Sequence, residues 1–113
     1  MDCLFCAIAK GEIPSEKVYE DEQILAFKDI DPQAPVHVLI IPKTHIKWAF
    51  DINAENSGVV AHIFEKIPEI ARSLGVDESG FRVVNNCGDA AGQSVKHLHF
   101  HLMAGREFGW PAG

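Results

Sequence analysis

Three histidines near the carboxyl end of the chain alternate with apolar residues in the segment 97–102, which reads HLHFHL. Successive side chains of an extended strand point to opposite faces, so we expect His97, His99 and His101 on one face and the apolar residues toward the core. At about 3.3 Å per residue, same-face neighbours lie about 6.6 Å apart, close enough to serve one small reacting group or one metal with its surroundings. Imidazoles titrate near neutral pH, attack phosphorus, exchange protons and bind metals. The pattern therefore predicts a strand with a reactive histidine face rather than a strand that carries histidines by chance.

Two segments upstream extend this pattern to a known family. Residues 29–45 read DIDPQAPVHVLIIPKTH, residues 13–15 read IPS, and residues 20–21 are an acidic pair. Together with the histidine segment they resemble the histidine triad (HIT) family of nucleotide hydrolases and transferases, over nearly the whole chain. The match is with the nucleotide-binding branch, whose members are small homodimeric purine nucleoside phosphoramidases. The resemblance implies the same activity here, hydrolysis of a phosphorus–nitrogen bond at the α-phosphate of a nucleotide.

The resemblance implies a division of roles among three histidines and one serine. His99, central in the triad, matches the family's nucleophile, which attacks the α-phosphorus and forms a nucleotidyl-histidine intermediate that water then hydrolyses. His101 would orient or protonate groups around that centre, and His37, on an adjacent strand, would complete the set near the leaving group. Ser94 corresponds to the family residue whose hydroxyl and backbone N–H meet the phosphate. Small residues around Ser94 let the backbone approach an anion closely, which suits that role.

The resemblance also implies which residues bind the nucleotide. Asp29 matches the carboxylate that accepts hydrogen bonds from both ribose hydroxyls, and a charged acceptor with two oxygens suits a vicinal diol. Asn86 and Gln93 belong to the nucleotide-binding set, Asn86 on the phosphate side, although ordinary turn chemistry is the alternative interpretation of Asn86 and Ser94. Five apolar side chains match the slot for the base, although alone they would be taken for core residues. The slot residues are Phe5, Ile8, Phe27, Ile30 and Leu39, and His99 and His101 complete the nucleotide site.

Cys3 and Cys6 are separated by two residues, a spacing typical of metal ligands, but two cysteines alone do not define a site. His45 and His97 could supply two further ligands, which would give a closed Cys2His2 tetrahedron that ties the N-terminus to the sheet. Some relatives in the family bind zinc through a corresponding set. Our hypothesis is a structural zinc ion on these four residues, with His99 left as the nucleophile. Two buried thiols without a metal are the alternative.

The segments that position these residues show strand and helix patterns in turn. Short strands are expected over residues 17–20, 24–28, 36–41 and 81–86, besides the histidine strand. Apolar spacing predicts an amphipathic helix over 55–74, ended by Gly75 and kinked at Pro68, and residues 3–11 predict a short helix or turn. Consecutive strands with short turns and one long helix indicate an α+β fold. We expect an antiparallel sheet of about five strands with one long helix and a short N-terminal helix, in a single domain over residues 1–113.

Ten basic and sixteen acidic residues give a formal net charge of −6. This argues against a nucleic-acid-binding surface, which needs clustered lysines and arginines, whereas backbone N–H groups and local dipoles can hold the phosphate of a single nucleotide. The 113 residues, 47% hydrophobic and 23% charged, are typical of a soluble globular protein, and no apolar run is long enough to span a membrane. Three cysteines do not suggest a disulfide framework, and residues 1–3 do not open a signal peptide, so we expect a cytoplasmic protein.

Two other functions are compatible with the sequence. His97, His99 and His101 could be ligands of a catalytic zinc ion, although three alternate residues of one strand spread along about 13 Å, too far for all to reach one ion easily. The chain could also be a nucleotide-binding regulatory or partner-binding protein whose hydrolysis is incidental. We prefer the phosphoramidase hypothesis, with a purine nucleotide or nucleoside phosphoramidate as ligand and a homodimer as assembly, because every reactive position of the family is kept.

Overall fold

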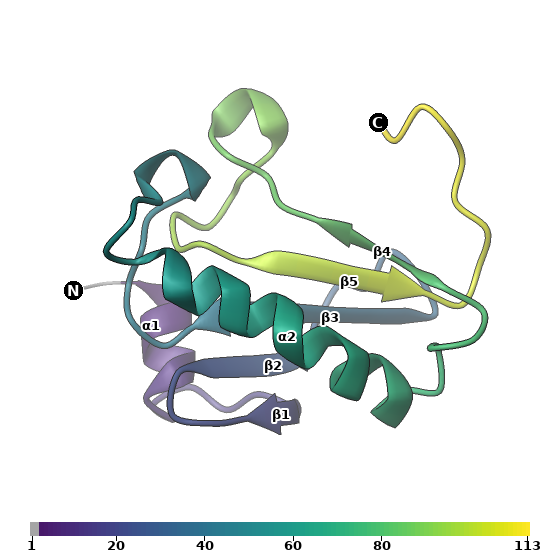
Figure 1. Ribbon diagram of the computed structural model, residues 1–113, viewed down its shortest axis with the longest axis horizontal. Helices are drawn as coiled ribbons and strands as arrows, with labels where there is room; N and C mark the ends of the chain where they lie inside the picture. The colour runs from purple at the N-terminus through teal and green to yellow at the C-terminus, as the bar shows by residue number, and fades with distance from the viewer. Residues whose placement is uncertain (1–2) are drawn as a thin grey trace.

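The computed structural model describes residues 3–113, and residues 1–2, on which the expectation of no signal peptide partly rests, lie outside them. The helices and strands follow the predicted order (Figure 1). Their bounds are α1 Leu4–Ala9, β1 Lys17–Glu20, β2 Ile24–Lys28, β3 Val36–Pro42, α2 Ser57–Ser73, β4 Phe81–Val84 and β5 Phe100–Ala104, with the short 3-10 helices η1 Ala49–Asp51 and η2 Asp89–Ala91. Within residues 3–113, no helix is both long and apolar enough to cross a membrane.

The five strands form one antiparallel sheet in the order β1-β2-β3-β5-β4. β1, β2 and β3 follow one another along the chain, and α2 then carries the chain across one face of the sheet to the edge where β4 lies (Figure 1). β5 returns between β3 and β4 and pairs with both. This confirms the predicted α+β arrangement. It also places the histidine strand beside β3, because Leu39 pairs with His101 and His37 with Met103.

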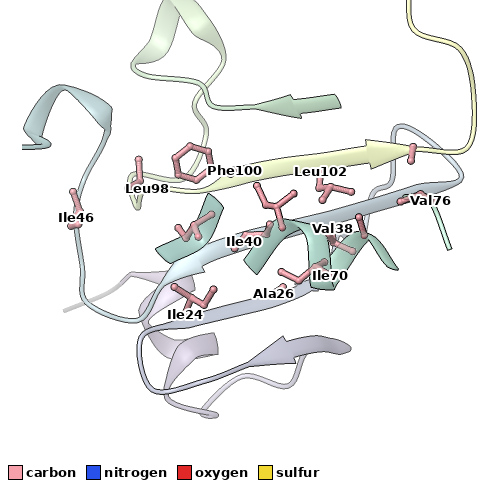
Figure 2. Close-up of a cluster of buried hydrophobic side chains, with 14 residues drawn as sticks. Ile24, Ala26, Val38, Ile40, Ile46, Ile70, Val76, Leu98, Phe100 and Leu102 are labelled. Carbon is pink, nitrogen blue, oxygen red and sulfur yellow. The ribbon is translucent and has the colours of Figure 1, made fainter. Parts of the chain in front are cut away.

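Side chains alternate along every strand, so the sheet has two faces, and each is covered by a different helix. The larger core lies on the α2 face and includes Ile24, Ala26, Val38, Ile40, Leu98, Phe100 and Leu102 with Ile63, Ile67 and Ile70 of α2 (Figure 2). The smaller core lies on the α1 face and consists of Phe5, Ile8, Leu25, Phe27, Leu39 and Ile41. Because Phe100 and Leu102 take the α2 face, the intervening His101 is directed to the α1 face.

α2 begins two residues later than predicted and ends one residue earlier. The start is delayed because Asn53 forms a turn of its own: its Oδ1 accepts the backbone N–H groups of Glu55 and Asn56 at 2.8 and 3.1 Å. Such side-chain acceptors compete with the first helical turn for the backbone donors. Pro68 lies inside the helix, which continues past it. Gly75 follows with a φ of +74°, a left-handed conformation that ends the helix as predicted.

β5 begins at Phe100, three residues later than predicted. Toward the far end of β3 stands Pro42, which has no N–H to donate to a neighbouring strand. The N–H of Leu98 bonds instead to the carbonyl of Ile46 at 2.6 Å. β4 was predicted over residues 81–86 and ends two residues earlier, at Val84. The first two histidines of the triad therefore lie in an irregular segment ahead of the strand, where their side chains are held individually rather than by sheet register.

Candidate active site and metal centre

His99 is buried beneath α1, at the end of the segment that precedes β5. The ring of Phe5 packs edge-on against it, with 5.1 Å between centroids. Nδ1 of His99 lies 2.7 Å from the carbonyl oxygen of His97, which can only accept, so Nδ1 carries the proton of the neutral ring and Nε2 keeps its lone pair. Burial lowers the pKa of His99, which favours this neutral form. His99 is thus held as an imidazole with one unprotonated nitrogen, the form that a nucleophile needs.

A chain of hydrogen bonds places the protons of His37 and His101. The backbone N–H of Gln33 donates to Nδ1 of His37 at 3.0 Å, so the proton of neutral His37 is on Nε2. That Nε2 lies 2.9 Å from Nδ1 of His101, which must accept, so the His101 proton is on its own Nε2. The rings of His101 and His99 are 5.0 Å apart. In these two neighbouring rings, Nε2 of His101 therefore carries a proton and Nε2 of His99 carries a lone pair.

Burial lowers the pKa of both members of this pair. For His101, burial and then charge on His99 and His37 lower the pKa to about 4. For His37, burial is the main cause, and the carboxylates of Asp29 and Asp31 oppose it. Both rings are consequently neutral at pH 7, which is the state that the hydrogen-bond chain describes.

Asp29 lies beside the pair, with Oδ2 3.4 Å from Nε2 of His37 and Oδ1 accepting the backbone N–H of Asp31 at 2.8 Å. The ligand atoms of Asp29, His37 and His101 lie within 4.8 Å of one another, close enough for a metal. A metal on Nε2 of His37, however, would move the ring proton to Nδ1, toward which the N–H of Gln33 already points. Two donors would then face each other. The group is therefore better suited to hold and pass a proton than to bind a metal.

A cavity of about 410 Å³ brings most of the predicted site residues together. The predicted residues that line it are Phe5, Ile8, Phe27, Asp29, Ile30, Leu39, Ser94, His99 and His101. The others that line it are Leu4, Ile13, Pro14, Lys28 and Val95. Ile30 is fully exposed, whereas His37 is only 5% exposed and reaches the cavity through His101. A largely apolar lining with a few convergent polar groups is typical of a small-molecule site.

Gln93 and Asn86, also predicted to bind the nucleotide, are not among the described residues that line this cavity. Gln93 is buried, and its amide is used by the backbone. Its Oε1 accepts the N–H of Gly88 at 2.9 Å, and its Nε2 donates to two backbone carbonyls at 2.9 and 3.0 Å. In this structure Gln93 therefore anchors the loop that presents Ser94.

Sequence reasoning missed two residues that order the histidines. Nδ2 of Asn85 donates to the carbonyl of His99 at 2.8 Å, and the backbone N–H of Gln33 donates to His37. The sequence shows two adjacent asparagines at 85–86, but only the position at which β4 ends decides which of them reaches His99. A backbone N–H has no side-chain signature, so nothing in the sequence could have singled out Gln33.

Cys3, Cys6, His45 and His97 converge beside α1, with their ligand atoms within 4.8 Å of one another. Nδ1 of His97 lies 3.3 Å from Sγ of Cys3 and 3.5 Å from Sγ of Cys6. Nδ1 of His45 lies 3.3 Å from Sγ of Cys6 and 3.2 Å from Nδ1 of His97. Ligand atoms around a tetrahedral zinc at usual bond lengths are about 3.3–3.8 Å apart, and these four distances lie within this range or about 0.1 Å below it. Nε2 of His97 lies 2.8 Å from the carbonyl of Pro42, which places the ring proton there and leaves the Nδ1 lone pair for a metal.

The geometry does not support a catalytic metal on His97, His99 and His101. Nδ1 of His97 faces the cysteines, Nδ1 of His99 faces a carbonyl, and Nδ1 of His101 faces His37. Among residues 3–113, neither group of potential metal ligands contains all three triad histidines.

Known proteins are similar to this chain in sequence and in fold. The family model described as the HIT domain matches residues 10–108. The crystal structure of a HIT family hydrolase from Legionella pneumophila has a TM-score of 0.96 and 49% identity, covering 99% of this chain and 100% of that one. A histidine triad nucleotide-binding protein from Candida albicans has a TM-score of 0.84 and 38% identity, covering 99% and 85%. A 14 kDa zinc-binding protein from Brassica juncea is 42% identical over 114 residues, 99% of this chain and all of the relative. On these matches, with the HIT domain model covering most of its length, the chain belongs to the HIT family.

Proposed function

We propose that this protein is a purine nucleoside phosphoramidase that acts through a covalent intermediate on His99. The observation that carries the proposal is the placement of protons: the unprotonated Nε2 of His99 stands beside His101, whose proton is on Nε2, in one cavity. A nucleophile next to a proton donor is what displacement at phosphorus requires. The similar proteins described as a hydrolase and as a nucleotide-binding protein agree with this chemistry.

The reaction would proceed in two displacements. The His37–His101 pair first takes up one proton from solvent and so carries a single positive charge. Nε2 of His99 attacks the α-phosphorus, the phosphorus–nitrogen bond breaks, and the nitrogen departs as an amine with that proton, which leaves the pair neutral. Water then attacks the same phosphorus, the bond to His99 breaks, and the proton that water loses returns to the pair. The sum consumes one water and releases a nucleoside monophosphate and an amine. Asp29, with Oδ2 3.4 Å from His37, stabilises positive charge that passes through the pair.

The cavity supports a nucleotide as the substrate. Phe5, Ile8 and Leu39 offer apolar surface on which a purine can pack, and they lie in the same cavity as the reactive histidines. Asp29 lines the cavity with a carboxylate that can accept ribose hydroxyls. Ser94, exposed in the loop that Gln93 anchors, offers a hydroxyl and a backbone N–H to the phosphate.

The test compares hydrolysis of an adenosine phosphoramidate by the wild type, His99→Ala and His62→Ala. His62 is the matched control because it lies on α2 and bonds to Asp21 at 2.7 Å, away from the cavity. We expect His99→Ala to lose several orders of magnitude in kcat, since the covalent route is gone, and His62→Ala to keep the wild-type rate. Mass spectrometry of wild-type protein that is denatured rapidly at alkaline pH, where a phosphorus–nitrogen bond to histidine survives, should show a nucleotidyl adduct that His99→Ala lacks.

Two results would overturn this proposal. Equal turnover by the wild type and His99→Ala would mean that His99 is not the nucleophile. Tight nucleotide binding by a wild type with no turnover would instead favour the regulatory or partner-binding function.

We further propose that Cys3, Cys6, His45 and His97 hold a structural zinc ion. Two thiolates and two imidazoles are a donor set that zinc prefers, and the relative described as zinc-binding agrees with it. The ion would tie α1 to the segments after β3 and before β5 without entering the reaction. Elemental analysis of protein purified without chelator should find one zinc per chain in the wild type and in Cys87→Ser, whose thiol is exposed and outside the cluster. Cys6→Ser should lose the metal, and a wild type without zinc would refute the site.

A further inference from the structure

The segment after β5 contacts and hydrogen-bonds the loop that precedes β3. These two segments meet at one end of the sheet because β5 ends where β3 begins, Ala104 pairing with Val36 (Figure 1). Arg106 directs its guanidinium to the carbonyl of Gln33, with Nε at 3.4 Å and Nη2 at 3.2 Å. Next to it Gly105 has a φ of +94°, and a Cβ added there would lie 2.8 Å from Cβ of Pro35. The turn at 105–106 therefore contacts the loop closely at two positions.

The backbone N–H of Gln33 points away from Arg106, toward His37. Its backbone N–H donates to Nδ1 of His37 at 3.0 Å, while its carbonyl receives Arg106. Its side-chain Nε2 bonds to the carbonyl of Asp31 at 3.0 Å, which keeps the loop compact. A backbone donor cannot rotate by itself as a hydroxyl can, so its aim depends on what holds its residue. Gln33 is thus the link between the exposed Arg106 and the buried His37.

If the Gln33 N–H no longer pointed at Nδ1 of His37, the direction of the hydrogen bond between His37 and His101 would reverse. Without the N–H of Gln33, the proton of His37 could reside on Nδ1, and Nε2 would then accept rather than donate. His101 would have to donate from Nδ1, which leaves its Nε2 without a proton. The ring beside His99 would then offer a lone pair where the departing nitrogen needs a proton.

We propose that Arg106 is a positioning residue: by holding the carbonyl of Gln33 it keeps the Gln33 N–H on His37 and so keeps the His101 proton on the nitrogen that serves the substrate. The tautomer part of this inference stands by itself, and its consequence for the rate rests on the proposed function. Arg106 touches none of the reacting groups and acts only through Gln33 and His37.

Arg82 provides a matched control. The centre of the Phe108 ring lies 4.3 Å from the guanidinium carbon of Arg106 and 5.1 Å from that of Arg82. Arg82 donates to the carbonyl of Gly109 at 2.9 Å, so it holds the same tail but bonds to no part of the loop. Removing either arginine loosens the stack on Phe108, and the two variants differ in the contact with Gln33.

The experiment reads the ring nitrogens of His37 by two-bond proton–nitrogen NMR at neutral pH, in protein labelled with nitrogen-15 histidine and assigned by the loss of signals in His37→Gln. We expect a protonated Nε2 and an unprotonated Nδ1 in the wild type and in Arg82→Ala. Arg106→Ala should show averaged shifts from both tautomers, and Arg106→Lys, which can still donate once to the carbonyl, should shift back toward the wild type. Backbone amide spectra of each variant check that the fold is kept.

Kinetics with the adenosine phosphoramidate complete the test. We expect kcat of Arg106→Ala to fall about 10- to 100-fold with little change in KM, because the substrate still binds while the proton is misplaced. An unchanged His37 tautomer in folded Arg106→Ala, an equal change in Arg82→Ala, or a changed tautomer with an unchanged kcat would each overturn the inference. A wild type that shows the expected tautomers but hydrolyses no phosphoramidate would refute the proposed function and leave the tautomer link standing.

Discussion

His97 and His99 are two residues apart and of one chemical type, yet their protons are on different ring nitrogens. His97 gives Nε2–H to the carbonyl of Pro42 and turns Nδ1 to the cysteines. His99 gives Nδ1–H to the carbonyl of His97 and keeps Nε2 unprotonated beside the cavity. A carbonyl can only accept, so each contact decides which nitrogen is left for a metal or for phosphorus.

Folding stability should fall in mildly acidic solution because of His101. Its pKa in the folded protein is about 4, whereas an unfolded imidazole titrates near 6.5. Between these values the unfolded state binds a proton that the folded state does not, so stability is present above the upper value and is lost as the pH falls through the window. We expect the wild type to lose about 1–2 kcal/mol more than His101→Gln between pH 7 and pH 5, measured by urea unfolding. Parallel losses in the two proteins would contradict a neutral, partly buried His101 ring.

Asp29 should discriminate ribonucleotides from their dideoxy analogues. Replacing it by asparagine removes the charged acceptor, and hydrogen bonds to charged groups contribute about 1.5–3 kcal/mol. We therefore expect Asp29→Asn to bind a nucleoside monophosphate about 10- to 100-fold more weakly by calorimetry, and to bind the 2′,3′-dideoxy compound no more weakly than the wild type does. Undiminished discrimination between the two ligands in Asp29→Asn would show that the ribose lies elsewhere.

At the scale of elements, α1 is six residues long, too short to be stable by itself in water. Phe5 and Ile8 bury it in the smaller core, and Sγ of Cys3 accepts the N–H of Cys6 at 3.3 Å at its first turn. The same two cysteines face His45 and His97. A metal ion there would therefore hold the helix that forms one wall of the cavity.

Removing the proposed zinc ion should loosen α1 and weaken nucleotide binding. We expect a strong chelator to lower Tm by about 10 °C or more, because a tightly bound ligand contributes a few kcal/mol to folding and 1 kcal/mol shifts Tm by about 4 °C in a chain of this size. Nucleotide Kd should rise in the same sample, since Phe5 and Ile8 line the cavity. Calorimetry measures both, with Cys6→Ser as the control that chelator should not affect. A wild type with unchanged Tm after metal loss would show that packing alone holds the helix.

At the scale of the whole molecule, the surface leaves apolar area uncovered. Within the described sheet β4 pairs only with β5, so its other side is an edge. Phe81 of β4 and Phe64 of α2 are 38% and 49% exposed, and Trp110 of the tail is 87% exposed. Exposed edges and apolar patches are sites where chains associate, which agrees with the homodimer that the family resemblance implies.

We expect the protein to sediment as a dimer at micromolar concentration, with twice the chain mass of 12.5 kDa. Phe64→Glu should shift it toward the monomer if this apolar surface is the interface, because a charge would have to be desolvated there. Phe50→Glu is the matched control, because Phe50 is also an exposed aromatic residue but lies on η1. It should leave the sedimentation of the dimer unchanged. Sedimentation of the wild type as a monomer would contradict the dimer.

Local patterns were sufficient for most of the fold. β1 and β2 were predicted with the bounds they have, since two short segments with strand-forming residues flank the acidic turn at 21–22. The predicted start of β5 at His97 was wrong by three residues, because the start depends on Pro42 and on the Leu98 N–H, which bonds to Ile46, a contact between segments distant in the sequence. The contact of Asn85 with the carbonyl of His99 was not anticipated for the same kind of reason, since the end of β4 positions that side chain.

The sequence by itself determined the family, the antiparallel α+β sheet and the face to which His101 points, because residue spacing and side-chain alternation are local properties of the chain. Only the tertiary structure decided what each histidine can do. The proton of His97 depends on a carbonyl 55 residues away, and that of His37 depends on Gln33, which Arg106 holds from 73 residues away. These partners are backbone groups, identical in every residue, so no side-chain pattern records them until the fold brings them together.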